Sequence, residues 1–193
     1  MNPLGHVVFA CGVAWAGVTL LDRARVAQPA LDAIHPDVAS AGQPGDAPRR
    51  RLAGVVDYGF VGVGSLLPDL IDKPLGLIFF RDLFDANSHL YGHTLLLSLL
   101  LLLTGSFLFA RRGDARLLCL GLGHVSHLLV DPVTHAPGTL LWPLLGAEFA
   151  HVTLLEPRET MITEAGAAAI MLLAGVLLWR AGRLRQFLRT GRL

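Results

Sequence analysis

The chain has 193 residues, of which 53% are hydrophobic and 16% are charged, and its formal net charge is +1. Soluble globular domains carry about 25% charged residues, so this composition indicates a membrane protein. The near-neutral charge gives no electrostatic reason to expect nucleic-acid binding. We predict an all-α, polytopic membrane helical bundle that forms a single domain over residues 1–193.

Apolar segments follow one another along the chain and define about five expected spans. They cover roughly residues 5–21, 53–71, 94–110, 116–133 and 164–180. Each is at or just below the ~20 residues that a helix needs to cross a bilayer. A very apolar soluble bundle is the alternative, but runs such as "LLLSLLLLL" are apolar on every side of a helix. The first segment lacks a basic leader, so we expect a retained helix and not a cleaved signal peptide.

The arginines predict the orientation of this five-span bundle. Residues 22–51, the turn at 111–116 and the tail at 180–193 carry thirteen basic residues on one side, against three on the other. Basic connections stay in the cytoplasm. We therefore expect a multi-pass protein of a bacterial or archaeal cytoplasmic (inner) membrane. Residues 22–51 should form a mobile loop or a short surface helix, and 181–193 a basic tail that contacts membrane lipid.

Side chains that commonly bind metals gather on the opposite, outer side of this topology. The orientation depends on the arginines alone, so the convergence of these side chains on one side is an independent sign of a site. The expected metal ligands are His6, Asp69, Asp72, His89, His93, His127, Asp131 and His135. Three further candidates, Glu148, His151 and Glu156, lie in the same outer connections but have less support.

Spacing in the fourth segment supports a shared site. His127 and Asp131 are four residues apart and share a helix face. Pro132 should end or bend the helix there, so that His135 turns back from a loop. His124 lies one turn deeper, where a packed or supporting role is the simpler interpretation.

The second and third segments offer similar pairs. Asp69 and Asp72 are three apart and can face one cavity, and His89 and His93 are four apart. We expect both histidines in the first turn of a helix that Asn87 or Ser88 caps.

Buried carboxylates and imidazoles at a membrane boundary are costly unless they are paired. A divalent cation satisfies several of them together. Mixed His and Asp ligands favour zinc, or manganese or iron, over calcium and magnesium. The number of candidates allows one or two ions. A hydrogen-bonded network without metal is the alternative.

Three motifs resemble the YdjM-like family of inner-membrane-associated, metal-dependent hydrolases, whose description also mentions LexA binding. They are "GSLLPDLID", "YGHTLL" and "GHVSHLLVDPVTHAPGTLLWP", and the likeness spans most of residues 1–146. The Arg of the family's His-Arg-Gly segment is missing, which leaves the role of His89 open. The resemblance carries over to His6, Asp69, Asp72, His93, His127, Asp131 and Thr134.

The order of potential ligands is also similar, more faintly, to that of zinc-dependent phospholipase C. The end of that pattern fails, because Glu156 does not lie four residues after His151.

The expected function is hydrolysis of an ester or phosphoester, with a lipid-linked substrate suggested by a site at headgroup depth. Metal-activated water would attack, and Asp69 or Asp72 would serve as a catalytic carboxylate. Two other classes remain open: a metal or proton transporter, and a non-catalytic membrane scaffold or regulator.

Overall fold

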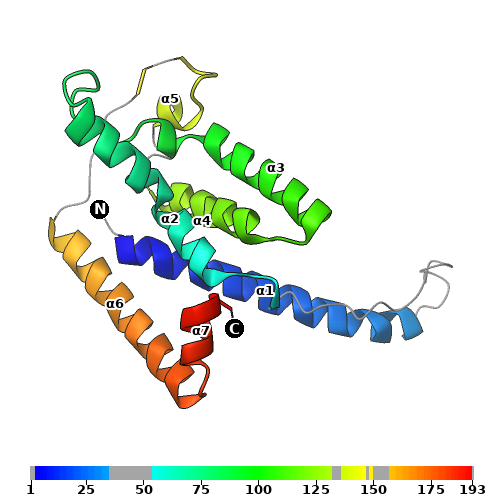
Figure 1. Ribbon diagram of the computed structural model, residues 1–193. Coiled ribbons are helices and arrows are strands. Elements are labelled where there is room, and N and C mark those ends of the chain that lie inside the picture. The colour runs from blue at the N-terminus through cyan, green and yellow to red at the C-terminus, as the bar shows by residue number, and fades with distance from the viewer. Residues whose placement is uncertain (1–2, 35–53, 132–135, 147, 150–156, 193) are drawn as a thin grey trace.

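The computed structural model describes residues 3–34, 54–131, 136–146, 148–149 and 157–192, and these contain helices and no strand (Figure 1). The all-α prediction is therefore confirmed. In chain order the elements are α1 (Pro3–Ile34), α2 (Tyr58–Lys73), the π-helical turn η2 (Pro74–Phe79), the 3-10 turn η3 (Tyr91–His93), α3 (Leu95–Arg112), α4 (Arg116–Val130), α5 (Pro137–Leu140), α6 (Pro157–Arg180) and α7 (Leu184–Thr190).

Within the described residues, three helices are long and apolar enough to cross a membrane, so the expected count of about five is too high. They are Pro3–Ala24 within α1, Leu95–Arg112, and Thr160–Arg180 within α6. By contrast, α2 has 16 residues and α4 has 15. At 1.5 Å per residue these two measure roughly 24 and 22 Å, short of a 30 Å hydrocarbon core.

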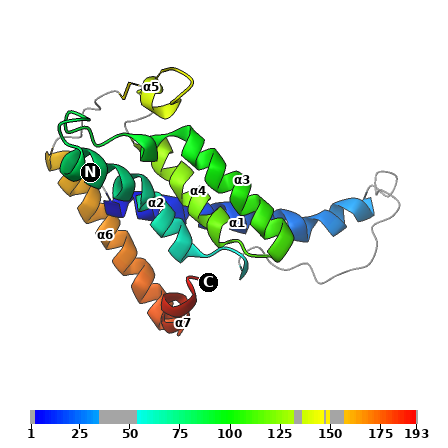
Figure 2. The ribbon, with the colours of Figure 1, turned by 45° about the horizontal axis from the view of Figure 1, so that its top comes forward.

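The long helices α1, α3 and α6 all begin at one end of the molecule, and α2 and α4 run back the other way (Figures 1 and 2). The α2 helix packs on α4, α3 packs on α4, and α1 contacts α2, α4 and α6. At the shared starting end, the backbone N–H of Leu4 donates to the Glu164 carboxylate at 3.2 Å. The two short helices therefore lie against several others, which leaves them less lipid-facing surface.

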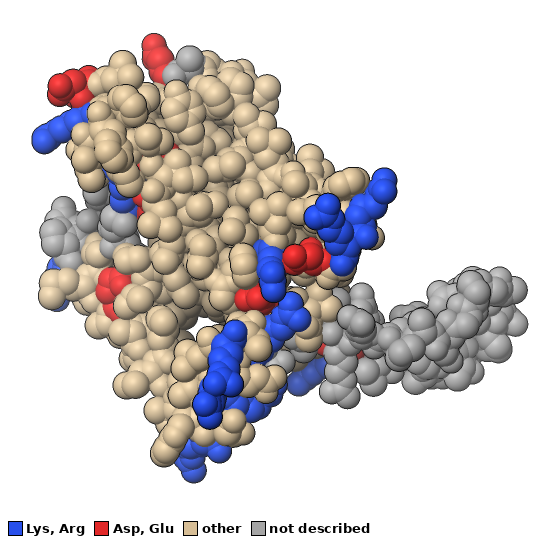
Figure 3. Space-filling view, in the orientation of Figure 1, with Lys and Arg blue, Asp and Glu red and all other residues tan. Residues whose placement is uncertain are grey.

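Polar side chains occupy much of the interior, and apolar side chains cover the outside. Leu103 on α3 and Leu172 on α6 are exposed, whereas His93, His124 and His127 are fully buried. This inverts the usual arrangement in water, and it fits a chain whose outer surface faces lipid. Lys and Arg gather at the end formed by α7 and the α3–α4 turn, and a wide uncharged surface lies beside them (Figure 3).

Glycines allow the close contacts between α2, α3 and α4. A Cβ at Gly64 would overlap the carbonyl of Leu120, and a Cβ at Gly123 would overlap the carbonyl of Val61. Small residues bring helix backbones together in this way in membrane proteins. The close α2–α4 approach brings the polar faces of these two helices together.

Local signals explain where the helices start and stop. Asp57 Oδ1 caps α2 by accepting the N–H groups of Gly59 and Phe60. The prediction that His89 and His93 open a helix is wrong, because Thr94 is the N-cap of α3 and its Oγ1 accepts Leu97 N–H at 3.3 Å.

Two other boundary predictions can be compared with the structure. The α4 helix ends at Val130 with Asp131 as its cap, as predicted from the following proline. Of the two alternatives given for residues 22–51, a mobile loop or a short surface helix, residues 22–34 are helical and continue α1; this stretch contains four alanines and two arginines, which favour helix. Residues 35–51 lie outside the described part of the chain.

Candidate metal centre

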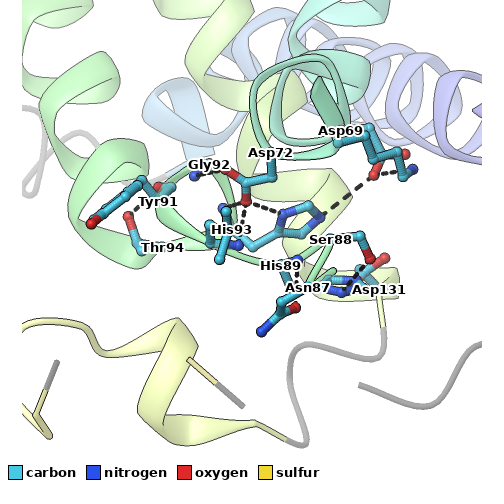
Figure 4. A network of polar contacts seen from close by, with 12 residues as sticks. Asp69, Asp72, Asn87, Ser88, His89, Tyr91, Gly92, His93, Thr94 and Asp131 are labelled. Atoms are coloured by element: carbon cyan, nitrogen blue, oxygen red, sulfur yellow. Dashed lines mark hydrogen bonds and ion pairs between the residues drawn. The ribbon is translucent and has the colours of Figure 1, made fainter. Parts of the chain in front are cut away.

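The imidazoles and carboxylates predicted as ligands meet where α1 and α3 begin and where α2 and α4 end. The loop before α3 supplies His89 and His93, α2 supplies Asp69, and Asp131 caps α4 (Figure 4). These four side chains are buried, and so are those of His6 and His127. The donor atoms that converge belong to His6, Asp69, His89, His93, His127 and Asp131, which we call the His–Asp cluster.

Asp72 fixes the loop that carries two of the histidines. Its Oδ2 accepts the N–H of Leu90 at 2.6 Å and the N–H and Nδ1–H of His93 at 3.1 and 2.7 Å. Its Oδ1 accepts the N–H of Gly92 at 2.7 Å. A Cβ at Gly92 would lie 2.9 Å from that oxygen, so glycine permits the approach. With both oxygens engaged, Asp72 holds the loop and orients His93.

Hydrogen bonds set the tautomers of His93 and His127. His127 Nδ1 lies 2.6 Å from the carbonyl oxygen of Ser65, which can only accept, so this nitrogen carries the proton. His93 Nδ1 likewise faces the Asp72 carboxylate. Both Nε2 atoms are then lone-pair acceptors, yet they lie 3.2 Å apart. Two such atoms in contact require a cation or a proton between them.

Carboxylates surround this pair of nitrogens. Asp131 Oδ2 lies 3.7 Å from His127 Nε2, and its Oδ1 lies 3.3 Å from His89 Nε2. Asp69 Oδ1 lies 3.7 Å from His93 Nε2 and also forms an ion pair with Lys73. Burial lowers the pKa of the Lys73 ammonium, and the Asp69 carboxylate opposes that shift.

In the part of the chain that the structure describes, three overlapping groups of residues could each hold an ion. They are His6 with His127 and Asp131, Asp69 with His93 and His127, and His89 with His93 and Asp131; the ligand atoms in each group lie within 4.8 Å of one another. The His6 ring stacks on that of His127 with centroids 4.0 Å apart, and its buried Nδ1 has no hydrogen-bond partner among the residues that the structure describes. A buried nitrogen without a partner fits a ligand better than a packed side chain.

The remaining candidates fall elsewhere. Glu148 is exposed. The buried His124 Nδ1 pairs with Ser98 Oγ at 2.8 Å, and His124 belongs to none of the three groups. Asp72 is not in them either. Thr134, His135, His151 and Glu156 lie outside the described residues.

Three residues of the site were missed from the sequence. Lys73 was counted only as an outer-side charge, although it follows Asp69 by four residues and so shares its helix face. The Ser65 carbonyl and the Gly92 N–H act through the backbone, and no side-chain pattern marks them.

Aromatic rings pack beside the His–Asp cluster. Tyr91, two residues before His93, lies 5.2 Å from the Trp142 ring and 4.9 Å from the Phe149 ring, measured between centroids. The Asn87 amide donates to the Phe149 carbonyl at 3.3 Å. These contacts join the segment after α5 to the loop that carries His89 and His93.

The fold and the site together define an all-helical membrane protein with a buried His–Asp cluster at one end. The chain belongs to the YdjM inner membrane protein family, whose model matches residues 1–188. The resemblance seen in the sequence motifs is thereby confirmed. No curated protein and no solved structure matches the chain.

Proposed function

We propose that this protein is a membrane-bound, metal-dependent hydrolase of ester or phosphoester bonds. The observation that carries the proposal is the contact between His93 Nε2 and His127 Nε2 at 3.2 Å. In a tetrahedral zinc site with Zn–N bonds of about 2.0–2.1 Å, ligand nitrogens lie roughly 3.3 Å apart. The spacing and the tautomers thus suit two ligands of one ion.

The chain offers further ligands for one or two ions. Asp69 and Asp131 would supply oxygen, and His6 and His89 would supply nitrogen. A divalent ion held there would supply Lewis-acid chemistry, making water more acidic and polarising the scissile group. Asp72 and the Ser65 carbonyl would orient the two central imidazoles, as partners of metal-bound histidines commonly do. Asp69, which lies on the open side of His93 beside Lys73, would be the catalytic carboxylate if it does not bind the ion itself.

A lipid-linked substrate follows from the surroundings of the cluster. Exposed apolar side chains project from the segments on either side of the site, including Phe79, Leu83 and Leu144. Exposed apolar side chains such as these are better suited to contact with lipid tails than with water. Soluble esters turned over with no activity on any lipid would count against this substrate class.

The metal content of the detergent-purified protein tests the centre. We expect one to two equivalents of zinc, manganese or iron in the wild type, and loss of the metal in His127→Ala combined with Asp131→Ala. The matched control is Asp82→Ala, which removes an exposed carboxylate from the same end. Absence of metal after reconstitution would leave a hydrogen-bonded network and favour the scaffold function.

Assays of hydrolysis and of metal transport distinguish a hydrolase from a transporter. Metal-dependent release of phosphate or alcohol from a lipid panel, absent in the double variant, would support hydrolysis. Metal uptake into proteoliposomes without hydrolysis would instead establish a transporter.

The proposed orientation places the cluster on the outer face of the membrane, with several passes. It rests on the basic residues at the other end, among them Arg112 and Arg180 in the last turns of α3 and α6. In a cysteine-free background, an impermeant maleimide should label Asp82→Cys from outside and Asp114→Cys only after permeabilisation. The reverse labelling would overturn this orientation.

A further inference from the structure

A second site lies at the opposite end of the molecule, far along α2 from the His–Asp cluster. It is an open pocket of about 710 Å³ between the start of α2 and the end of α7. The tail folds back to form it: α7 packs its Phe187 ring 6.5 Å from Tyr58, and the Gly191 carbonyl accepts Tyr58 N–H at 2.7 Å. The predicted basic tail is thus partly an ordered wall of this pocket.

Three arginines line the pocket, from two segments distant in sequence. Arg189 and Arg192 come from the tail, and Arg116 comes from the first turn of α4. Asp57 is the acidic side chain in the lining, and its Oδ1 already accepts two α2 N–H groups. The positive charge therefore exceeds the negative, and guanidinium groups bind phosphate oxygens well.

The rest of the lining is apolar. Phe60, Val63 and Leu188 face the pocket, and all three are exposed, Leu188 by 73%. The Arg116 guanidinium lies 6.0 Å from the centre of the Phe60 ring. A purely soluble anion would use the arginines and leave these apolar surfaces in water, whereas an amphiphile would use both.

The pocket also lies at the depth where the apolar surface ends. At the same end of the molecule, α3 finishes with Arg111 and Arg112, and α6 finishes with Trp179 and Arg180. Arginine and tryptophan in these positions mark the boundary between hydrocarbon and headgroups. Anionic phosphates of membrane lipids are concentrated at this level.

We infer that this pocket binds the phosphate headgroup of an anionic phospholipid, with Arg116, Arg189 and Arg192 on the phosphate and Phe60, Val63 and Leu188 against the first part of the acyl chains. The bound lipid joins α7 to the start of α2 and α4. The site does not depend on the metal centre, because it shares no residue with the His–Asp cluster.

Native mass spectrometry of the detergent-purified full chain tests the inference. Phosphatidylglycerol is titrated against phosphatidylcholine, and inorganic phosphate is added as a competitor. Replacing Arg116, Arg189 and Arg192 with Gln removes three charge-assisted contacts to the phosphate and should weaken phosphatidylglycerol binding roughly 100-fold. The control replaces Arg111, Arg112 and Arg180 with Gln, which removes equal charge outside the pocket, and should change binding by less than about threefold.

A second variant keeps the charge unchanged. Val63→Trp places a larger side chain in the apolar part of the pocket and should therefore also reduce lipid binding. Equal losses in the pocket and control variants would mean general charge attraction and overturn the site. Displacement of the lipid by millimolar phosphate, or equal binding of phosphatidylcholine, would likewise overturn it. If the triple variant does not fold, Val63→Trp with unchanged lipid binding would still refute the inference.

Discussion

Replacing Asp72 by Asn tests how the loop before α3 is held. The side chain is fully buried and accepts hydrogen bonds from three backbone N–H groups and one imidazole. Asparagine keeps one acceptor oxygen, but its NH₂ group must face a backbone donor. The substitution is nearly isosteric, so the effect isolates charge and hydrogen bonding from packing.

The magnitude follows from the individual contacts. Three hydrogen bonds to Oδ2 would lose the contribution of the negative charge, about 1 kcal/mol each. The Gly92 N–H would be left facing a donor, which costs about another 1–3 kcal/mol. We expect the free energy of unfolding to fall by about 4–6 kcal/mol in total.

Unfolding of the detergent-purified protein by a denaturing detergent in mixed micelles measures this value. Metal affinity should also fall about 10–100-fold, because His93 loses the partner that orients it. Asp82→Asn, on the exposed surface of the same end, is the control and should leave both quantities unchanged. A loss below about 1 kcal/mol with normal metal binding would refute the role assigned to Asp72.

Two further substitutions test the helix packing and the charge beside the site. Gly123→Ala places a Cβ against the Val61 carbonyl and should lower the free energy of unfolding by about 2–4 kcal/mol; Gly166→Ala on α6, where a Cβ meets nothing within 4 Å, should change it by no more than about 0.5 kcal/mol. Similar effects of the two in a denaturation series would contradict the close α2–α4 contact. Lys73→Met removes the cation paired with Asp69, so metal affinity should rise about tenfold and the metal-free protein should become less stable. Isothermal titration with Arg81→Gln as control measures this, and unchanged or weaker affinity would show that Lys73 does not compete for Asp69.

Periodicity and charge were enough to predict the helical class and the end of the molecule where His6, His93 and His127 meet. Those predictions depend on local properties: apolar runs, arginine placement and the four-residue helix repeat. The same local properties do not predict the number of membrane-spanning helices. The α2 and α4 helices are as apolar as the others by composition, and only their lengths and their contacts with neighbouring helices separate them.

The roles within the cluster depend on backbone groups that a sequence does not reveal. Asp69 and Asp72 look equivalent in "LLPDLID", since both lie on one helix face three residues apart. The structure separates them: Asp72 meets the N–H groups of a folded loop, and Asp69 meets Lys73 and the open side of the His93 ring. That difference depends on Gly92, which lets the loop backbone approach α2. A close contact between two segments that are far apart in the sequence cannot be inferred from residue spacing.

The polar interior and the metal proposal are linked by one physical requirement. Lipid solvates apolar side chains well, so the bundle gains little by burying them and can place polar groups inside, provided that each finds a partner. The Nδ1 atoms of His93 and His127 both have hydrogen-bond partners: the Asp72 carboxylate accepts from His93, and the Ser65 carbonyl accepts from His127. Those same bonds leave the two Nε2 lone pairs facing each other, with Asp69 and Asp131 adding negative charge nearby. If a metal ion binds these two nitrogens, as we propose, the stability of the folded state should depend on that ion. Chelation should therefore lower the unfolding temperature of the wild type, and it should have much less effect once His127 and Asp131 are both replaced by Ala.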